Sequence, residues 1–139
     1  MRSGSSILVL GVGELGMDVL RPLAPRAAAV GTAVSVLLRP ATIASTEPAK
    51  RAELRSLGVA LVAGDIATTS EEVLAALFAL YDEVLSCVGF AAGHGTQLKL
   101  ARAALRTAVG RYLPWQFDAS ATAASLAARL SARDARVGR

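Results

Sequence analysis

The positions at which this sequence could do chemistry begin near its amino terminus. Gly11, Gly13 and Gly16 form the pattern G-x-G-x-x-G directly after the apolar run 7–10. In such a pattern the first glycine permits a tight turn, the second lets the backbone approach a pyrophosphate, and the third lets a helix pack closely on the strand. A helix that begins there offers free N–H groups and the positive end of its dipole. The pattern predicts a dinucleotide-binding turn, and the alternative is a glycine-rich turn without a ligand.

The residues after the second apolar run, 34–38, indicate which dinucleotide would bind. An NAD site places Asp or Glu at this strand end to hold the ribose 2′-hydroxyl, whereas a nearby Arg accommodates the 2′-phosphate of NADP. Here Arg39 follows Leu38 directly, and the next acidic residue is Glu47. These residues favour NADP, with Lys50 as a second cation if the intervening loop folds back. A solvated surface charge is the alternative for both cations.

Two later strand ends lie at the same edge of the predicted sheet. Asp65 and Ile66 follow the third apolar run, where an adenine ring would rest, and Asp65 either bonds to the base or caps a turn. Cys87 lies near the end of the fourth run, on the nicotinamide side. We expect it to be a small buried hydrophobe rather than a nucleophile, because no histidine is placed to act as its base. Gln97 opens the next helix and either points at the cofactor or serves as a cap.

A catalytic proton donor is not recognisable in the sequence. The Tyr-x-x-x-Lys pair of short-chain dehydrogenases is missing, because Tyr81 is followed four residues later by Leu85 and Tyr112 by Gln116. No Ser-His-Asp nucleophile set can be assembled either. The catalytic residues are therefore unknown at this stage, although the cofactor pattern is clear.

Composition narrows the class of protein further. The chain has 139 residues, of which 53% are hydrophobic, so general disorder is excluded and a single domain is expected. A single cysteine, Cys87, excludes an intrachain disulfide, and a single histidine, His94, argues against a metal site. No apolar run reaches the roughly 18 residues that a membrane span needs, and no secretory signal is recognisable. We expect a cytoplasmic protein that does not bind membranes.

Short apolar runs alternate with helical patterns through most of the chain. The runs predict five parallel strands at 7–10, 34–38, 59–63, 84–88 and 111–114. Four helices are expected, at 14–23, 49–57, 71–80 (opened by a Thr69-Ser70-Glu71-Glu72 capping box) and 96–109, with 41–48 as a loop. This describes an α/β fold, a doubly wound parallel Rossmann sheet in the order 3-2-1-4-5 with helices on both faces.

Charge and composition change near Asp118. Residues 1–118 hold 11 basic and 10 acidic side chains, whereas 119–139 hold four Arg, one Asp and eight Ala. We therefore predict an NAD(P)-binding domain over 1–118 and an Ala/Arg-rich tail over 119–139 that is a weak helix or disordered. A nucleic-acid contact of the tail is the less favoured interpretation, because a few arginines on a short helix usually form a solvated face.

The body of the chain resembles the N-terminal part of the NmrA-like, isoflavone-reductase-like family, within it the fungal aromatic-alcohol-reductase-like branch. The stretches behind this resemblance are ILVLGVGELGMDVL (7–20), VLLRP (36–40), LRSLGVALVAGDI (54–66), VLSCVGFAAGHGTQLKLARAAL (84–105) and GRYLPWQF (110–117). The resemblance implies an extended Rossmann fold, NADPH as cofactor and reduction of small aromatic compounds. It also implies two groups of cofactor contacts. The phosphates would meet Gly11, Gly13, Glu14, Leu15, Gly16, Arg39 and Lys50, and the nicotinamide side would be lined by Cys87, Val88, Gly89, Phe90 and Pro114.

Two features depart from the family pattern. The isoflavone branch has the loop G-x-x-G-x-x-G, and the shorter loop of this chain is compatible with binding. The family continues after the fifth strand with a catalytic lysine and a substrate-binding portion, whereas this chain passes after Phe117 into the tail, as a truncated chain would. Two functions stay open: a reductase with substrate over Phe90 and Trp115, or a non-catalytic NADP-binding redox sensor of NmrA type. Apolar surface exposed by truncation would favour instability or a homodimer.

Overall fold

The computed structural model describes residues 5–11, 14–45, 48–88, 95–107 and 110–113. The elements follow in the order β1 (Ser6–Leu10), α1 (Glu14–Ala29), β2 (Ala33–Leu38), α2 (Pro40–Ser45), α3 (Pro48–Ser56), β3 (Ala60–Ala63), α4 (Glu71–Phe78), β4 (Glu83–Ser86), α5 (Thr96–Leu105) and β5 (Arg111–Leu113). The strands form one sheet in the order β3-β2-β1-β4-β5, and every pairing is parallel. The predicted strand order is confirmed.

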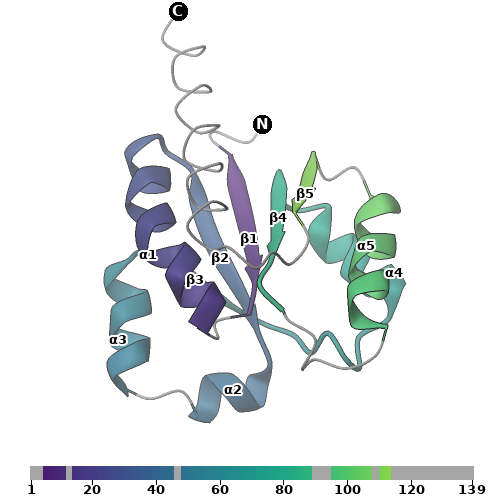
Figure 1. The fold of residues 1–139 in the computed structure, drawn as a ribbon, viewed down its shortest axis with the longest axis horizontal. Coiled ribbons are helices and arrows are strands. Elements are labelled where there is room, and N and C mark those ends of the chain that lie inside the picture. Colours follow the sequence, from purple (N-terminus) through teal and green to yellow (C-terminus); the bar gives the residue numbers. More distant parts are fainter. Residues whose placement is uncertain (1–4, 12–13, 46–47, 89–94, 108–109, 114–139) are drawn as a thin grey trace, which may run out of the picture.

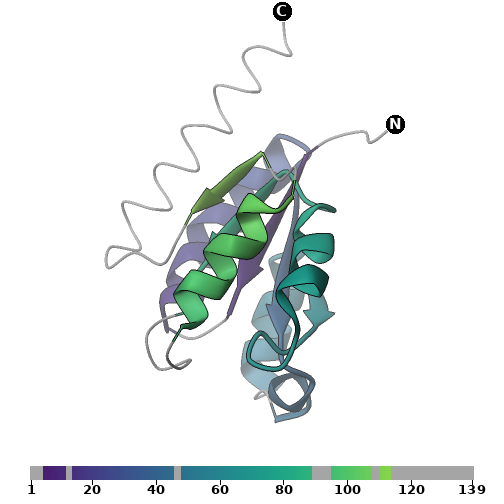
Figure 2. The same ribbon diagram turned by 90° about the vertical axis from the view of Figure 1, so that its right-hand side faces the viewer.

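Alternate side chains of the central strand β1 enter two separate cores. Ile7 and Val9 pack with residues of α1 and α3, whereas Leu8 and Leu10 pack with residues of α4 and α5. Figure 1 shows α1 and α3 on one side of the sheet and α4 and α5 on the other, and Figure 2 shows α4 and α5 next to each other. A strand buried on both faces needs apolar residues at consecutive positions, which explains the continuous run. The doubly wound α/β class is confirmed.

Helix α1 is longer than the sequence pattern predicted, because it continues past Pro22 and ends at Ala29. Pro22 and Pro25 lack the N–H groups that would bond to the carbonyl oxygens of Asp18 and Arg21, and both of these residues are exposed, so their carbonyl groups can bond to water. On the buried side, Leu23 and Ala27 are inaccessible to solvent and belong to the core beneath the helix. Burial of this stripe offsets the lost hydrogen bonds and keeps the helix continuous.

The connection between β2 and β3 contains two helices, so the predicted loop over 41–48 is wrong for 41–45 and for Pro48, while 46–47 lie outside the described residues. Pro40 begins α2, and the N–H of Ile43 donates a hydrogen bond to the carbonyl oxygen of Arg39 at 3.0 Å. Proline suits the first helical turn because its missing N–H would have no partner there. Helices α2 and α3 both occupy this connection, so the described ranges hold five helices rather than the four predicted.

Helix α4 is present as predicted, although the capping box is not. Ser70 is the N-cap, and its side chain accepts a hydrogen bond from the N–H of Val73 at 3.2 Å. A capping box needs Glu or Gln at the third helical position, which Val73 occupies. The acidic side chains Glu71 and Glu72 instead pair with Arg106, after the end of α5, at 3.1 and 2.9 Å. These ion pairs join the two helices at the surface.

The remaining element ends lie close to their predicted positions. Helix α5 ends at Leu105 and strand β4 at Ser86, a few residues before the expected ends at 109 and 88. The tail over 119–139 lies outside the described residues, so the boundary near Asp118 stays a prediction. Within the described ranges, no helix combines the length and the apolar character that crossing a bilayer requires.

Candidate functional site

The turn between β1 and α1 depends on two glycines. Gly11 has a φ of +92°, in the region that residues with a side chain rarely adopt. A Cβ on Gly16 would lie 2.3 Å from the carbonyl oxygen of Gly11 and 3.7 Å from the Cβ of Cys87. Only a residue without a side chain therefore lets α1 approach the strand end so closely. Gly11 and Gly16 have the turn and packing geometry that the motif predicts, and their contact with a dinucleotide stays a prediction.

Backbone hydrogen bonds bring the predicted site residues together at the carboxyl end of the sheet. The N–H of Gly11 donates to the carbonyl oxygen of Leu37 at 3.3 Å, and the N–H of Cys87 donates to that of Leu10 at 2.9 Å. The glycine turn is thus held between the ends of β2 and β4. The chain passes from β1 to β2 on one side of β1, and after β3 it crosses to β4 on the other side of β1. Open α/β sheets bind ligands at such a switch point.

Cys87 lies in the core beside the glycine turn. Its exposed fraction is 8%, and burial raises the pKa of its thiol to about 12. A thiol with this pKa stays protonated near neutral pH and is a poor nucleophile. The expectation of a small buried hydrophobe is confirmed. The next residue, Val88, is half-buried, and its Cγ2 lies 3.5 Å from the place that a Cβ on Gly11 would take.

The loop after β3 is held by its own turn and by a lysine from α5. Asp65 Oδ1 accepts a hydrogen bond from the N–H of Ala67 at 2.9 Å, so the turn-capping role considered for Asp65 is present. Lys99 Nζ donates to the carbonyl oxygen of Ile66 at 2.7 Å and to that of Ala67 at 3.4 Å. The sequence pattern did not single out Lys99 as a residue that holds this loop. Its position in the first turn of a helix that follows a strand end was the available signal.

Gln97 fixes the end of β4. Its Nε2 donates a hydrogen bond to the carbonyl oxygen of Val88. The N-cap of α5 is Gly95, with a φ of +77° and no side-chain cap bond, so the capping role considered for Gln97 is wrong. Gln97 orients the backbone beside the switch point, and a contact of its side chain with a cofactor stays a prediction.

The two cations predicted for a 2′-phosphate belong to different elements. Arg39 follows the last residue of β2 and is exposed, and Lys50 is half-buried in the first turn of α3. Because Leu10 pairs with Leu37, Arg39 lies beside the glycine turn at the same edge of the sheet. Helix α2 covers 40–45 of the connection that was expected to fold back as a loop. The phosphate roles of Arg39 and Lys50 stay predictions.

Some predicted site residues lie outside the described residues, namely Gly13, Gly89, Phe90 and Pro114, together with Trp115 on the substrate side. For Glu14 and Leu15 the backbone of α1 is described, and their side chains are not. The cofactor contacts of all these residues stay predictions. Across the described ranges, no group of three or more His, Cys, Asp or Glu side chains could hold a metal ion.

A glycine turn against a helix N-terminus, at the switch point of a doubly wound sheet, defines the Rossmann class of dinucleotide-binding folds. Solved structures share this fold. A chain from the crystal structures of pinoresinol-lariciresinol and phenylcoumaran benzylic ether reductases has a TM-score of 0.63 and 23% identity, over 84% of this chain and 37% of that one. The binary complex of leucoanthocyanidin reductase with NADPH from Vitis vinifera has a TM-score of 0.61 and 19% identity, over 91% of this chain and 46% of that one.

The sequence gives a closer relationship. It is 45% identical over 115 residues to an NmrA-like family domain-containing oxidoreductase of Gibberella moniliformis, a match that covers 81% of this chain and 38% of that protein. No protein-family model matches the sequence. The chain is a homologue of this NmrA-like oxidoreductase, and the resemblance noted in the sequence is confirmed. The chain spans less than half the length of the relatives that it matches.

Proposed function

We propose that this chain is the NADPH-binding domain of an NmrA-like reductase that acts on small aromatic compounds. The observation that carries the proposal is the glycine turn. Gly11 has a positive φ and Gly16 lies against its carbonyl group, which is the tight turn and the close helix packing that a dinucleotide-binding motif needs. This geometry fits a dinucleotide. NADPH, when bound, supplies a hydride from its nicotinamide ring.

The choice of NADP over NAD rests on the end of β2. Arg39 follows Leu38 there, where an NAD site would have a carboxylate. Its guanidinium is exposed at the sheet edge that carries the glycine turn, so it is accessible to a 2′-phosphate. The fold shared with a leucoanthocyanidin reductase solved with NADPH is consistent with this choice.

The substrate class rests on homology. The curated relative is an oxidoreductase, and the resemblance of 84–105 and 110–117 to the aromatic-alcohol-reductase-like branch favours small aromatic substrates. Phe90 and Trp115 are the residues of this chain that we expect beneath such a ring. The sequence match covers 38% of the relative, so further substrate contacts would correspond to parts of that protein beyond the match.

One observation favours a second candidate, a non-catalytic NADP-binding redox sensor. Burial raises the pKa of Cys87 to about 12, which makes its thiol a weak acid, and neither Tyr81 nor Tyr112 has a lysine four residues later. The described ranges therefore contain no recognised proton donor for a reductase. A sensor would need the cofactor site alone.

Titration of the purified chain with NADPH and with NADH tests both candidates. We expect NADPH to bind more tightly than NADH. NADPH oxidation with aromatic aldehydes then separates the two functions: turnover supports the reductase, and binding without turnover supports the sensor for this chain. If neither nucleotide binds, the assignment of the glycine turn is wrong.

A further inference from the structure

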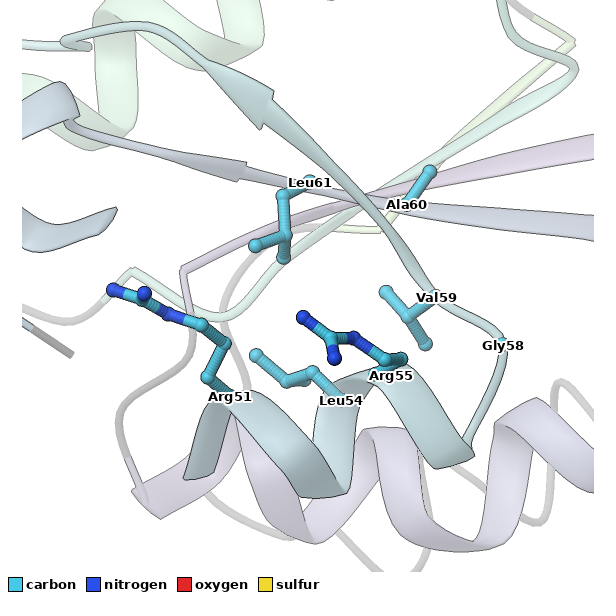
Figure 3. A pocket seen from close by; sticks show the side chains of 7 residues that line it. All are labelled: Arg51, Leu54, Arg55, Gly58, Val59, Ala60 and Leu61. Atoms are coloured by element: carbon cyan, nitrogen blue, oxygen red, sulfur yellow. The ribbon is translucent and has the colours of Figure 1, made fainter. Parts of the chain in front are cut away.

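A groove with a volume of about 310 Å³ lies between helix α3 and strand β3, apart from the glycine turn. Figure 3 shows Leu54 and Val59 beside it, with Leu61 across from the helix. Arg51 and Arg55 project from α3 along the same groove (Figure 3). The site is therefore an apolar surface bordered by two guanidinium groups.

Strand β3 forms one edge of the sheet. It pairs with β2 alone in the described sheet, so its outer backbone groups have no strand partner there. Such an edge is a template for another strand unless charges, proline or a bulge protect it. The segment 59–64, VALVAG, has no charged residue and no proline, and Leu61 is 38% exposed. This edge is open to addition of a strand.

The positive charges of Arg51 and Arg55 beside the groove favour a negatively charged partner. Glu53, the acidic residue of α3, is held by Arg21 of α1 through two hydrogen bonds of 3.0 and 3.2 Å. Arg51 uses one guanidinium nitrogen to donate to the carbonyl oxygen of Ile43. Neither Arg51 nor Arg55 forms an ion pair with any acidic side chain of the described residues. The groove therefore presents positive charge to whatever lies along β3.

A second copy of the chain fits this edge poorly. Antiparallel pairing of two β3 strands about a twofold axis would bring the α3 helices of both copies to the same seam. Arg51 and Arg55 would then face the same two residues of the other copy, and like charges in contact are unfavourable. A partner strand with carboxylates could pair with both guanidinium groups and form backbone hydrogen bonds with the outer edge of β3.

We infer that the groove binds an extended acidic segment of another protein, which pairs with β3 as an added strand. Alternate residues of a strand lie about 6.6 Å apart, and residues four apart on a helix lie about 6 Å apart. Two carboxylates at alternate positions can therefore meet Arg51 and Arg55. An apolar residue at the next alternate position would cover Leu54, Val59 and Leu61.

The test uses a fluorescein-labelled peptide, GTETETLTGS, which carries Glu, Glu and Leu at alternate positions. We expect saturable binding in fluorescence anisotropy, and slower amide exchange at 60–63 when the peptide is present. A matched peptide with both Glu changed to Lys, GTKTKTLTGS, should bind at least about tenfold more weakly. Equal binding of the two peptides, or no saturable binding of the acidic one, would overturn the proposal.

Charge reversal of the protein provides the second arm. Arg55→Glu should weaken the acidic peptide about tenfold and strengthen the lysine peptide, because Arg55 is exposed and can change without loss of packing. Arg102→Glu, an exposed arginine on α5, is the matched control and should change neither affinity. An equal loss in both variants contradicts the assigned groove. Dimerisation in sedimentation velocity that Arg55→Glu strengthens, with slower amide exchange at 60–63 in the dimer, would show a second copy as the occupant and overturn the proposal.

Discussion

Gly16 lies so close to Gly11 that a methyl group on the first would sit 2.3 Å from the carbonyl oxygen of the second. Helix α1 therefore rests directly on the end of β1. Gly16→Ala should push the helix away and cost about 1–3 kcal/mol of unfolding free energy, as overpacking does. It should also weaken NADPH binding, because the helix N-terminus moves. Denaturant unfolding and nucleotide titration measure the two effects.

Gly31→Ala is the control for this substitution. Gly31 has a φ of +73° but nothing within 4 Å of its Cβ position, so the variant should lose about 1–2 kcal/mol through backbone strain alone. We expect its NADPH affinity to match that of the unchanged chain once both are folded. If Gly16→Ala also leaves the affinity unchanged, the glycine turn is a packing feature without a ligand.

Cys87 should resist alkylation. Because burial raises its pKa to about 12, almost no thiolate is present at pH 8, and the side chain is also buried. We expect iodoacetamide to leave the folded chain unmodified and to label it fully in denaturant, with mass spectrometry as the readout. Rapid labelling of the native chain would mean that Cys87 is open to solvent.

The same pKa predicts a loss of stability in alkali. The ordinary thiol pKa is 9.0, and the folded value is about 12, so the unfolded chain releases this proton first as the pH rises. The contribution of Cys87 to stability is complete below about pH 9 and is lost as the pH rises toward about 12. Cys87→Ala should flatten this part of the curve of unfolding free energy against pH. An unchanged slope would contradict the assignment.

Lys99 should control the order of the loop after β3. Lys99→Met removes the 2.7 Å hydrogen bond to the Ile66 carbonyl oxygen and should cost about 1 kcal/mol while retaining much of the side chain's length. We expect faster amide exchange at 65–69. Arg102→Met, an exposed position on the same helix, is the control. Equal exchange in the two variants would show that Lys99 does not hold the loop.

The sheet could be predicted because its signal is local. Ile7, Leu8, Val9 and Leu10 are buried on both faces, so the strand appears as an unbroken apolar run whatever surrounds it. The glycine turn is a local signal too, because Gly11 and Gly16 lie within one short stretch of the sequence. These local signals explain why the strands and the glycine turn could be predicted from the sequence, whereas the strand order followed from the usual topology of doubly wound sheets.

The length of α1 and the hydrogen bonds of Gln97 and Lys99 depend on contacts between separate segments of the chain, which a local pattern does not show. Pro22 indicated the end of a helix, yet tertiary burial of Leu23 and Ala27 carries the helix past it. In the sequence Lys99 shows only its place at the start of a helix, and Gln97 suggested a cofactor contact or a cap rather than a bond to the backbone. Their roles come from the backbone carbonyl groups of Ile66 and Val88, which the fold brings to them from other elements.

The central claim is that this domain binds NADPH through the edge of the sheet that carries the glycine turn and Arg39. Its most direct test compares the dissociation constants of NADPH and NADH for the unchanged chain, Arg39→Asp and the control Arg102→Asp. We predict that Arg39→Asp weakens NADPH by about tenfold or more, from the loss of a charge-assisted contact, while NADH changes little. The control should behave as the unchanged chain. Equal losses for both nucleotides in Arg39→Asp would contradict the 2′-phosphate role, and absence of binding to the unchanged chain would contradict the account as a whole.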